Sequence, residues 1–318
     1  MNRYARQEQL PEVGPEGQAR LRAARVLVVG CGGLGSAVIP ALAGAGVGHL
    51  HLMDADRVEE SNLHRQTLYR MEDIGRAKVV AAAGAIFALN PDLSVSMQCA
   101  RLDAGNVASA LEGADLVVDA ADSFAATYCL SDACRTAGVP MISASVLGTS
   151  GYVGGFCGPA PSYRAVFPDL PVQHRSCAEA GVMGPAVATL GAMQAQMALS
   201  CLLGLDPAPL GQMVQVDLGS WRLSSFRFDG AEEVPGHGFV ALSQLTTADR
   251  IIELRPEDEA ALAVPGAERW SIERLGALPS YAGRTVLACR SGLRAWAAAD
   301  QLAALGHRDL ALMAAGDS

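Results

Sequence analysis

The chain has 318 residues, half of them hydrophobic and 18% charged, and it carries a formal net charge of −9 at pH 7. This length predicts about two domains, and the apolar content excludes a disordered chain. The acidic balance excludes a nucleic-acid backbone as the substrate, because binding one requires clustered lysine and arginine. The composition is that of an enzyme with a well-buried core.

The N-terminus carries no recognisable targeting segment. Residues 1–7 contain two arginines with no apolar run behind them, so we expect no secretory signal and predict a cytoplasmic protein. The longest apolar stretch, residues 184–204, contains Gln194 and Gln196, which favours a buried core helix over a membrane span. The eight cysteines form no paired framework, which indicates free thiols.

Strands and helices alternate along the first half of the chain. The predicted strands are residues 25–30, 49–54, 94–99, 115–120 and 140–145. The predicted helices between them are residues 35–45, 77–89, 107–111 and 124–137. This alternation predicts an α/β fold with a doubly wound, mostly parallel sheet of the Rossmann type. Ligands of such sheets bind at the carboxyl ends of the strands.

A segment with linker composition, residues 229–238, divides the chain. The larger domain is predicted to span residues 1–228 and a smaller α/β domain to span residues 239–318. The elements expected in the smaller domain are strands at residues 251–254, 285–289 and near Leu310, and a helix at residues 293–305.

A glycine-rich loop separates the first predicted strand from the first helix. It contains Gly30, Gly32, Gly33 and Gly35. Glycines let a backbone approach a phosphate closely, and the helix that follows offers N–H donors. Asp54 ends the next strand, where a carboxylate binds ribose hydroxyls. This much of the pattern also fits a nicotinamide dehydrogenase.

Cationic and amide side chains soon after the loop favour a different chemistry. Lys78 is the only lysine in a chain with 23 arginines, and Asn62 and Arg65 precede it. Hydride transfer needs no such cluster, whereas nucleotidyl transfer needs cations to offset charge on the departing pyrophosphate. A solvated helix residue is the alternative for Lys78. Asp122 follows a strand, where its carboxylate fits either a Mg²⁺ ligand or a helix N-cap.

These motifs together resemble the ThiF/MoeB/HesA family, the bacterial relatives of ubiquitin-activating enzymes, over residues 1 to about 228. The resemblance is carried by Arg3-Tyr4-Ala5-Arg6-Gln7, the glycine loop, Asp54-Ala55-Asp56, Ser61-Asn62-Leu63-His64-Arg65-Gln66, Lys78, Asp119-Ala120-Ala121-Asp122 and the segment from Cys177 to Pro185. It implies that ATP is used to adenylate the C-terminal Gly-Gly carboxylate of a ubiquitin-like sulfur-carrier protein.

The resemblance also assigns expected roles to residues. The expected ATP site consists of Gly30, Gly32, Gly33, Gly35, Asp54, Asp56, Ser61, Asn62, Arg65, Lys78, Asp122 and Ser123. Asp54 would bind the ribose, Asn62, Arg65 and Lys78 the phosphates, and Asp122 a Mg²⁺ ion. The family has asparagine where this chain has Ser123, which puts a nucleotide contact there in question.

Two further residues have roles that the resemblance implies. Family members work as dimers, so Arg6 would enter the ATP site of the partner subunit. Cys177 would form a covalent link to the activated carrier, and the alternative for it is an ordinary loop thiol.

The small domain contains a cysteine loop between an apolar strand and a helix. The loop reads Cys289-Arg290-Ser291-Gly292-Leu293-Arg294. Its amides and the helix dipole would converge on the sulfur of Cys289 and stabilise a thiolate or persulfide. From about residue 239 the chain resembles a rhodanese domain. It has Glu253-Leu254-Arg255 where rhodaneses have Asp-x-Arg, and a degenerate, purely structural domain is the alternative.

Many family members hold a structural zinc ion between two Cys-x-x-Cys pairs. This chain has Ser162 and Ala165 where the first pair would fall, and no cysteine lies between Cys201 and Cys289 to supply the second. Because such a site needs four ligands, we predict no zinc.

The sequence therefore predicts a homodimeric, ATP- and Mg²⁺-dependent adenylyltransferase joined to a sulfurtransferase. Sulfur would reach the carrier from a persulfide on Cys289, loaded by thiosulfate or a cysteine desulfurase. The alternative within the family is activation of a ubiquitin-like protein or peptide without sulfur transfer, with the tail as a docking module. A nucleotide-sensing protein without turnover is the alternative from another class.

Overall fold

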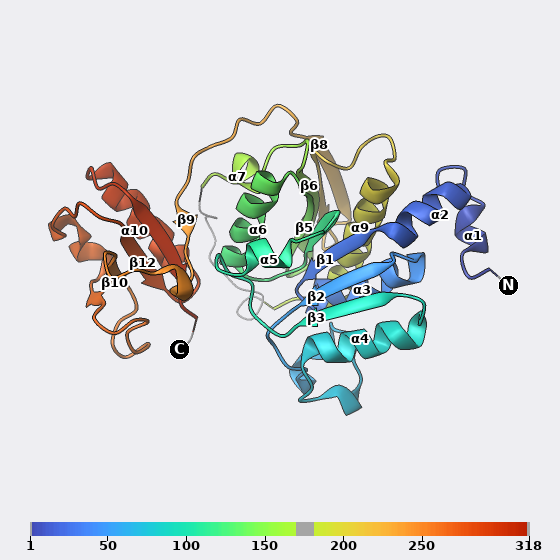
Figure 1. The fold of residues 1–318 in the computed structure, drawn as a ribbon, viewed down its shortest axis with the longest axis horizontal. Helices are drawn as coiled ribbons and strands as arrows, with labels where there is room; N and C mark the ends of the chain where they lie inside the picture. Colours follow the sequence, from blue (N-terminus) through green and yellow to red (C-terminus); the bar gives the residue numbers. More distant parts are fainter. Residues whose placement is uncertain (1, 170–180, 317–318) are drawn as a thin grey trace.

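The computed structural model describes residues 2–169 and 181–316, which form two sheets with helices packed on them (Figure 1). The larger sheet has eight strands in the order β3-β2-β1-β4-β5-β6-β7-β8. Their bounds are β1 (Arg25–Val29), β2 (His49–Met53), β3 (Ser94–Gln98), β4 (Leu116–Asp119), β5 (Pro140–Leu147), β6 (Ser150–Cys157), β7 (Gln212–Asp217) and β8 (Arg222–Arg227).

The strands from β3 to β5 pair in parallel, and those from β5 to β8 pair antiparallel. The predicted mostly parallel α/β sheet is confirmed, with strand limits within two residues of those expected for β1 to β5. The antiparallel strands β6, β7 and β8 were not predicted. In β6, glycines interrupt the apolar pattern, because the neighbouring chain approaches closely: a Cβ at Gly155 would lie 2.5 Å from the carbonyl oxygen of Pro209.

Helices cover both faces of the larger sheet (Figure 1). Their bounds are α1 (Ala5–Glu8), α2 (Gly14–Ala23), α3 (Gly33–Ala45), α4 (Lys78–Leu89), α5 (Val107–Ala110), α6 (Phe124–Ala137), α7 (Tyr163–Val166) and α9 (Gly184–Leu203). Side chains alternate along β1, so Val26 and Val28 join the core with α3, α4 and α9, while Leu27 and Val29 join the core with α5 and α6.

Helix α9 is a core helix, as predicted. Within the described ranges it is the one helix whose length and apolar composition would suit a membrane span. It instead packs along α3, and its Gln194 is fully buried. The Gln194 side-chain nitrogen donates to the carbonyl oxygens of Asp119, at 2.6 Å, and Ile142, at 3.0 Å. These bonds tie the helix to the ends of two sheet strands.

The smaller sheet has five parallel strands in the order β11-β10-β12-β13-β9. Their bounds are β9 (Gly238–Phe239), β10 (Arg250–Glu253), β11 (Glu268–Arg269), β12 (Thr285–Cys289) and β13 (Leu310–Ala314). Helix α10 (Leu293–Ala304) packs on one face, with Trp296 in the core that it forms with β10 and β12. The predicted strands at 251–254 and 285–289 and the helix after Cys289 are therefore present.

The two sheets lie on either side of the predicted linker. Strand β8 ends at Arg227, β9 begins at Gly238, and no helix or strand lies between them. Tyr128 of α6 belongs to the core of the smaller sheet, so the halves share packed side chains. Whether residues 1–228 and 239–318 fold as separate domains stays a prediction.

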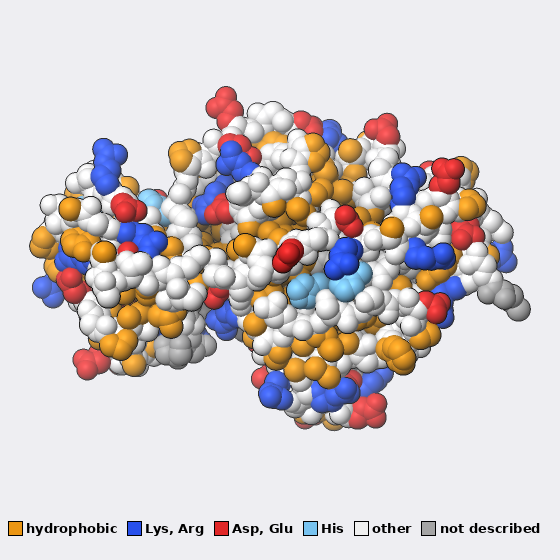
Figure 2. Space-filling view, viewed as in Figure 1, with side chains coloured by type: hydrophobic (Ala, Val, Ile, Leu, Met, Phe, Trp, Pro, Cys, Tyr) orange, Lys and Arg blue, Asp and Glu red, His pale blue; other side chains and the backbone are white. Residues whose placement is uncertain are grey.

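Hydrophobic side chains gather on one part of the surface, over α4 and β3 (Figure 2). The large exposed apolar residues of these two elements are Val80, Phe87, Leu89 and Met97. Charged side chains of both signs surround this part of the surface in Figure 2.

Candidate nucleotide and sulfur-transfer sites

The glycine loop turns tightly between β1 and α3. Gly30 has a φ of +97°, and a Cβ placed on it would lie 2.4 Å from the carbonyl oxygen of Ala120. A Cβ on Gly35 would lie 2.2 Å from the carbonyl oxygen of Gly30. Both positions therefore require glycine. The loop lies where β1 and β4 run side by side and their connections diverge, which is where ligands of doubly wound sheets bind.

Asp54, directly after β2, fixes the shape of this loop. One carboxylate oxygen accepts from the backbone N–H of Cys31 at 2.7 Å, and the other accepts from the N–H of Asp56 at 2.7 Å. Burial raises the pKa of Asp54, and the two N–H donors offset that shift in part. The structure thus joins Asp54 to the glycine loop, while its contact with ribose stays a prediction.

Lys78 begins α4 and is only 5% exposed, so the alternative of a solvated helix residue is wrong. Its ammonium donates to the carboxylate of Asp56 at 2.8 Å. The Tyr69 hydroxyl donates to the carbonyl oxygen of Cys31 at 2.6 Å and lies 3.5 Å from that of Lys78. Two polar routes, through Tyr69 and through Asp56 and Asp54, therefore connect Lys78 with the glycine loop.

The segment after Asp56 also packs against the glycine loop. A Cβ on Gly33 would lie 3.9 Å from Cγ of Arg65. The Arg65 guanidinium donates to the carbonyl oxygen of Ser61 at 3.2 Å, and Asn62 donates to the Ser61 hydroxyl at 3.3 Å. Gln66 is buried beside the loop, and within the described ranges its side-chain oxygen has no hydrogen-bond partner. Arg65 thus lies beside the glycine loop, while the phosphate-binding roles of Asn62 and Arg65 stay predictions.

Asp122 and Ser123 lie just past β4, at the start of α6. The Ser123 hydroxyl accepts from the N–H of Ala126 at 3.4 Å, so Ser123 is the N-cap and the N-cap alternative for Asp122 is wrong. Asp122 is exposed. Mg²⁺ commonly binds through one or two carboxylates together with substrate phosphates, so a lone carboxylate here fits that ion. The magnesium role of Asp122 stays a prediction.

Arg6 lies far from the glycine loop of its own chain. It is exposed on α1, and its neighbour Gln7 donates to the carbonyl oxygen of Ala45 at the end of α3. The glycine loop lies at the start of α3, and a helix of 13 residues is about 20 Å long. This placement is compatible with the expected action of Arg6 in a partner subunit. Cys177 lies outside the described residues.

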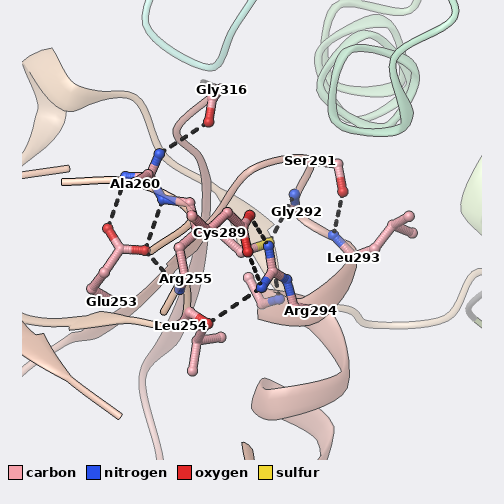
Figure 3. A network of polar contacts seen from close by, with 12 residues as sticks. Glu253, Leu254, Arg255, Ala260, Cys289, Ser291, Gly292, Leu293, Arg294 and Gly316 are labelled. Carbon is pink, nitrogen blue, oxygen red and sulfur yellow. Dashed lines mark hydrogen bonds and ion pairs between the residues drawn. The ribbon is translucent and has the colours of Figure 1, made fainter. Parts of the chain in front are cut away.

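The cysteine loop of the small sheet folds around a buried sulfur (Figure 3). Cys289 ends β12 and is fully buried. Its Sγ accepts from the backbone N–H groups of Gly292, at 3.2 Å, and Ala295, at 3.3 Å. Gly292 has a φ of +90°, which favours glycine there. This is the arrangement expected of a loop that carries an anionic sulfur.

Glu253 and Arg255 form a fully buried, two-pronged ion pair beside the cysteine loop (Figure 3). The Nε and Nη2 atoms of Arg255 each lie 2.9 Å from a carboxylate oxygen of Glu253. The bonds from Glu253 raise the pKa of Arg255. Arg294, on the loop's last position, pairs with Glu259, with Nη1 2.8 Å from Oε2. Glutamate therefore replaces the aspartate of the Asp-x-Arg pattern without loss of the pair.

Polar side chains stand where the zinc ligands would be. The Ser162 hydroxyl donates to Glu233 at 2.6 Å, and Arg164 donates to both carboxylate oxygens of Asp132, at 2.6 and 2.8 Å. Ala165 offers no ligand atom. In the described part of the chain, no group of three histidine, cysteine or acidic residues is arranged to bind a metal. The side chains at these positions do not fit a zinc site.

The sequence did not indicate three residues that the structure places at these sites. Tyr69 bridges the glycine loop and α4, and Gln194 ties α9 to β4 and β5. Arg164 lies between the two halves of the molecule. Arg164 alone could have been singled out from the sequence, because it lies between Ser162 and Ala165, where family members have a cysteine pair. No sequence pattern predicts the partners of Tyr69 or Gln194.

Comparison with known proteins agrees with this geometry. The model of the ThiF family matches residues 4–234, and the chain belongs to that family. Its relatives include the sulfur carrier protein adenylyltransferase of Thermus thermophilus, 43% identical over 225 residues that cover 68% of this chain and 83% of that protein.

A second relative is the adenylyltransferase and sulfurtransferase UBA4 of Yarrowia lipolytica, 44% identical over 64% of this chain. The match covers 52% of that protein. Among solved structures, that of Escherichia coli MccB with MccA-N7isoASN has a TM-score of 0.64 and 24% identity, covering 72% of this chain and 73% of the other. That likeness shows the fold alone.

Proposed function

We propose that this protein uses ATP to adenylate the C-terminal Gly-Gly carboxylate of a ubiquitin-like sulfur-carrier protein. The observation that carries the proposal is the polar connection from Lys78 through Asp56 and Asp54 to the N–H of Cys31 in the glycine loop. It connects the one lysine of the chain with the glycine loop, where the proposal puts the phosphates of ATP. The names of the Thermus and Yarrowia relatives support the same activity.

In the reaction, a carboxylate oxygen of the carrier attacks the α-phosphorus of ATP. The bond from that phosphorus to the bridging oxygen of the β-phosphate breaks, and pyrophosphate leaves with the electron pair. Lys78, Arg65 and the free N–H groups at the start of α3 offset the growing negative charge. Lys78 exchanges its bond with Asp56, which is mostly exposed, for phosphate oxygens. Asp122 would hold a Mg²⁺ ion, which would supply further positive charge to the phosphates.

The cysteine loop would supply sulfur to the acyl-adenylate. The Cys289 thiolate attacks the outer sulfur of thiosulfate, and sulfite leaves, or the outer sulfur of a cysteine desulfurase persulfide, and the desulfurase thiolate leaves; either exchange forms a persulfide on Cys289. The outer sulfur attacks the carrier's carbonyl carbon, directly or after Cys177 has formed a thioester with it, and the bond to AMP or to Cys177 breaks. A thiol reductant then cleaves the resulting acyl disulfide, which releases the carrier as a thiocarboxylate. The buried sulfur with two N–H donors supports this role for Cys289.

Carrier-dependent ATP–pyrophosphate exchange tests the first half. We expect exchange with the native chain and a loss of at least about a hundredfold with Lys78→Ala, as for other groups that stabilise a charged transition state. Arg76→Ala is the matched control, because Arg76 lies two residues away, is exposed and pairs with Asp73. Equal exchange by Lys78→Ala and Arg76→Ala would remove Lys78 from the site.

Persulfide formation tests the second half. Mass spectrometry after incubation with thiosulfate should find an added sulfur on Cys289 and none in Cys289→Ser. Cys99→Ser, which removes an exposed thiol, is the control and should load normally. If Cys289→Ser still delivered sulfur to the carrier at the native rate, the proposal for this loop would be wrong and activation without sulfur transfer would replace it.

A further inference from the structure

Arg164 lies at the junction of the two sheets, and neither proposed reaction step uses it. It is only 6% exposed. The guanidinium carbon lies 4.8 Å from the centre of the Tyr128 ring, on α6, and 5.2 Å from the centre of the Trp296 ring, on α10. Those two rings pack edge to face with centres 4.9 Å apart. One cation therefore contacts an aromatic side chain of each half.

The polar bonds of Arg164 also reach both sides of the junction. Its Nε and Nη2 donate to Asp132 on α6, and Nη2 also donates to the carbonyl oxygen of His237, one residue before β9, at 3.0 Å. Within the described ranges Nη1 is buried and has no hydrogen-bond acceptor. A desolvated guanidinium over the negative face of an aromatic ring is attracted more strongly than an exposed one. The aromatic contacts thus stabilise an ion whose hydrogen bonding is incomplete.

The halves also meet away from Arg164, where the Gln244 side-chain nitrogen donates to the carbonyl oxygen of Ala104 at 3.0 Å. A cleft of about 420 Å³ opens between α5, α6 and β9, and its lining includes Val107, Cys129 and Phe239. The interface is interrupted there, and the cluster around Arg164 is one of the places where the halves are in contact.

This junction sets where the cysteine loop lies. Trp296 packs on Phe124, the first residue of α6, with ring centres 5.5 Å apart. A Cβ on Gly292 would lie 2.6 Å from the Phe239 ring and 3.8 Å from Cβ of Ala125. Ala125 is in the first turn of α6, two residues after Ser123 and three after Asp122. The loop of Cys289 therefore lies against the helix end that borders the proposed ATP site.

We propose that Arg164 is a positioning residue that docks the small sheet so that the persulfide of Cys289 reaches the acyl-adenylate made by the same chain. The proposal rests on the proposed function. In the transfer step, the outer sulfur forms a bond to the carbonyl carbon, the carbon–oxygen bond to AMP breaks, and AMP leaves with the electron pair. Arg164 takes no part in that exchange and acts only through the placement of the loop.

The test compares the full-length native chain with Arg164→Met, which keeps the length of the side chain and removes its charge. Asp132 is partly exposed and stays hydrated in this variant. Three quantities are measured: carrier-dependent ATP–pyrophosphate exchange, persulfide loading of Cys289, and the single-turnover rate of sulfur transfer to the adenylated carrier. We expect the first two to stay within about twofold and the transfer rate to fall about tenfold or more, since small misplacements of reacting groups cost that much.

Two further variants separate positioning from general damage. Arg227, at the end of the exposed strand β8, makes a two-pronged bond to Asp229, as Arg164 does to Asp132. Arg227→Met should therefore leave the transfer rate unchanged. Arg164→Lys keeps the cation beside the rings and should restore part of the rate. Transfer by Arg164→Met at the native rate, with exchange and loading intact, would overturn the inference.

A failure of the proposed function would look different. If the native chain showed no exchange, adenylation would be overturned, and if Cys289 accepted no sulfur, the sulfurtransferase step would be overturned. The docking role is then decided by small-angle X-ray scattering of the native chain and Arg164→Met. A larger radius of gyration in the variant supports the role of Arg164, and superimposable profiles contradict it.

Discussion

At the scale of single residues, Asp119, at the end of β4, makes the stability of the folded chain depend on pH. It is buried, and the Ser143 hydroxyl donates to its carboxylate at 2.8 Å. Burial raises the pKa of Asp119 from about 3.8 to about 6. The unfolded chain therefore loses this proton at a lower pH than the folded chain does. The resulting stabilisation is complete below pH 3.8 and is lost as the pH rises through 6.

Asp119→Asn removes this dependence. The free energy of unfolding of the native chain, minus that of the variant, should fall as the pH rises. The total fall should be about 3 kcal/mol, because the pKa of Asp119 is raised by about two units and two units correspond to roughly that amount. Urea unfolding between pH 4.5 and 7.5 measures this difference in free energy. It should fall mostly below pH 6 and level off above that pH. A difference that stays constant over this range would contradict the assignment.

Glu253 tests the buried ion pair next to Cys289. Glu253→Gln should destabilise the small sheet by about 3–5 kcal/mol, because it removes the buried carboxylate that makes the two-pronged bond with the Arg255 guanidinium. Glu268→Gln is the matched control: Glu268 makes a two-pronged pair with Arg250 that is partly exposed, and its loss should cost less than about 1 kcal/mol. If both variants lost the same free energy of unfolding in urea, burial would not set the strength of these ion pairs.

At the scale of elements, the sequence predicted those whose pattern follows from local physics. Strands β1 and β4 are apolar runs, Gly30, Asp54 and Asp119 mark the ends of β1, β2 and β4, and the helices between the strands have clear limits. Strands β6 to β8 were missed, because glycines and polar residues interrupt their apolar pattern and pairing with distant segments makes them strands. The residues of the glycine loop could be predicted from sequence order. The contacts of Tyr69 and Arg164 could not, since they join residues far apart in the chain.

Helix α3 offers a matched pair of glycine substitutions. A Cβ at Gly35 would meet the carbonyl oxygen of Gly30, whereas a Cβ at Gly44 would meet nothing within 4 Å. Gly35→Ala should therefore distort the glycine loop and weaken ATP binding about tenfold or more. Gly44→Ala should bind ATP normally and gain up to about 1 kcal/mol in stability, as alanine favours a helix. Titration calorimetry with ATP checks both, and normal binding by Gly35→Ala would exclude the loop as the phosphate site.

At the scale of the whole molecule, the position of Arg6 requires a second copy of the chain if it is to act at an ATP site. The exposed apolar side chains over α4 and β3 in Figure 2 are compatible with burial in such a dimer. Arg6→Ala and Lys78→Ala should each lose exchange activity. A mixture of the two should regain up to about a quarter of the native activity, since mixed dimers have one intact site. If the mixture recovered no activity after subunits had exchanged between the dimers, Arg6 would not act at the site of the partner subunit.

The most direct test of the whole account is the mass of the carrier protein after incubation with ATP, Mg²⁺, a sulfur donor, a thiol reductant and this chain. The account predicts that the native chain replaces one oxygen of the C-terminal carboxylate by sulfur. Lys78→Ala and Cys289→Ser should each abolish the product, the first because the carboxylate is not activated and the second because no sulfur is delivered. A carrier of unchanged mass, with AMP and pyrophosphate produced, would contradict sulfur transfer, and thiocarboxylate made at the native rate by Cys289→Ser would contradict the role of that cysteine.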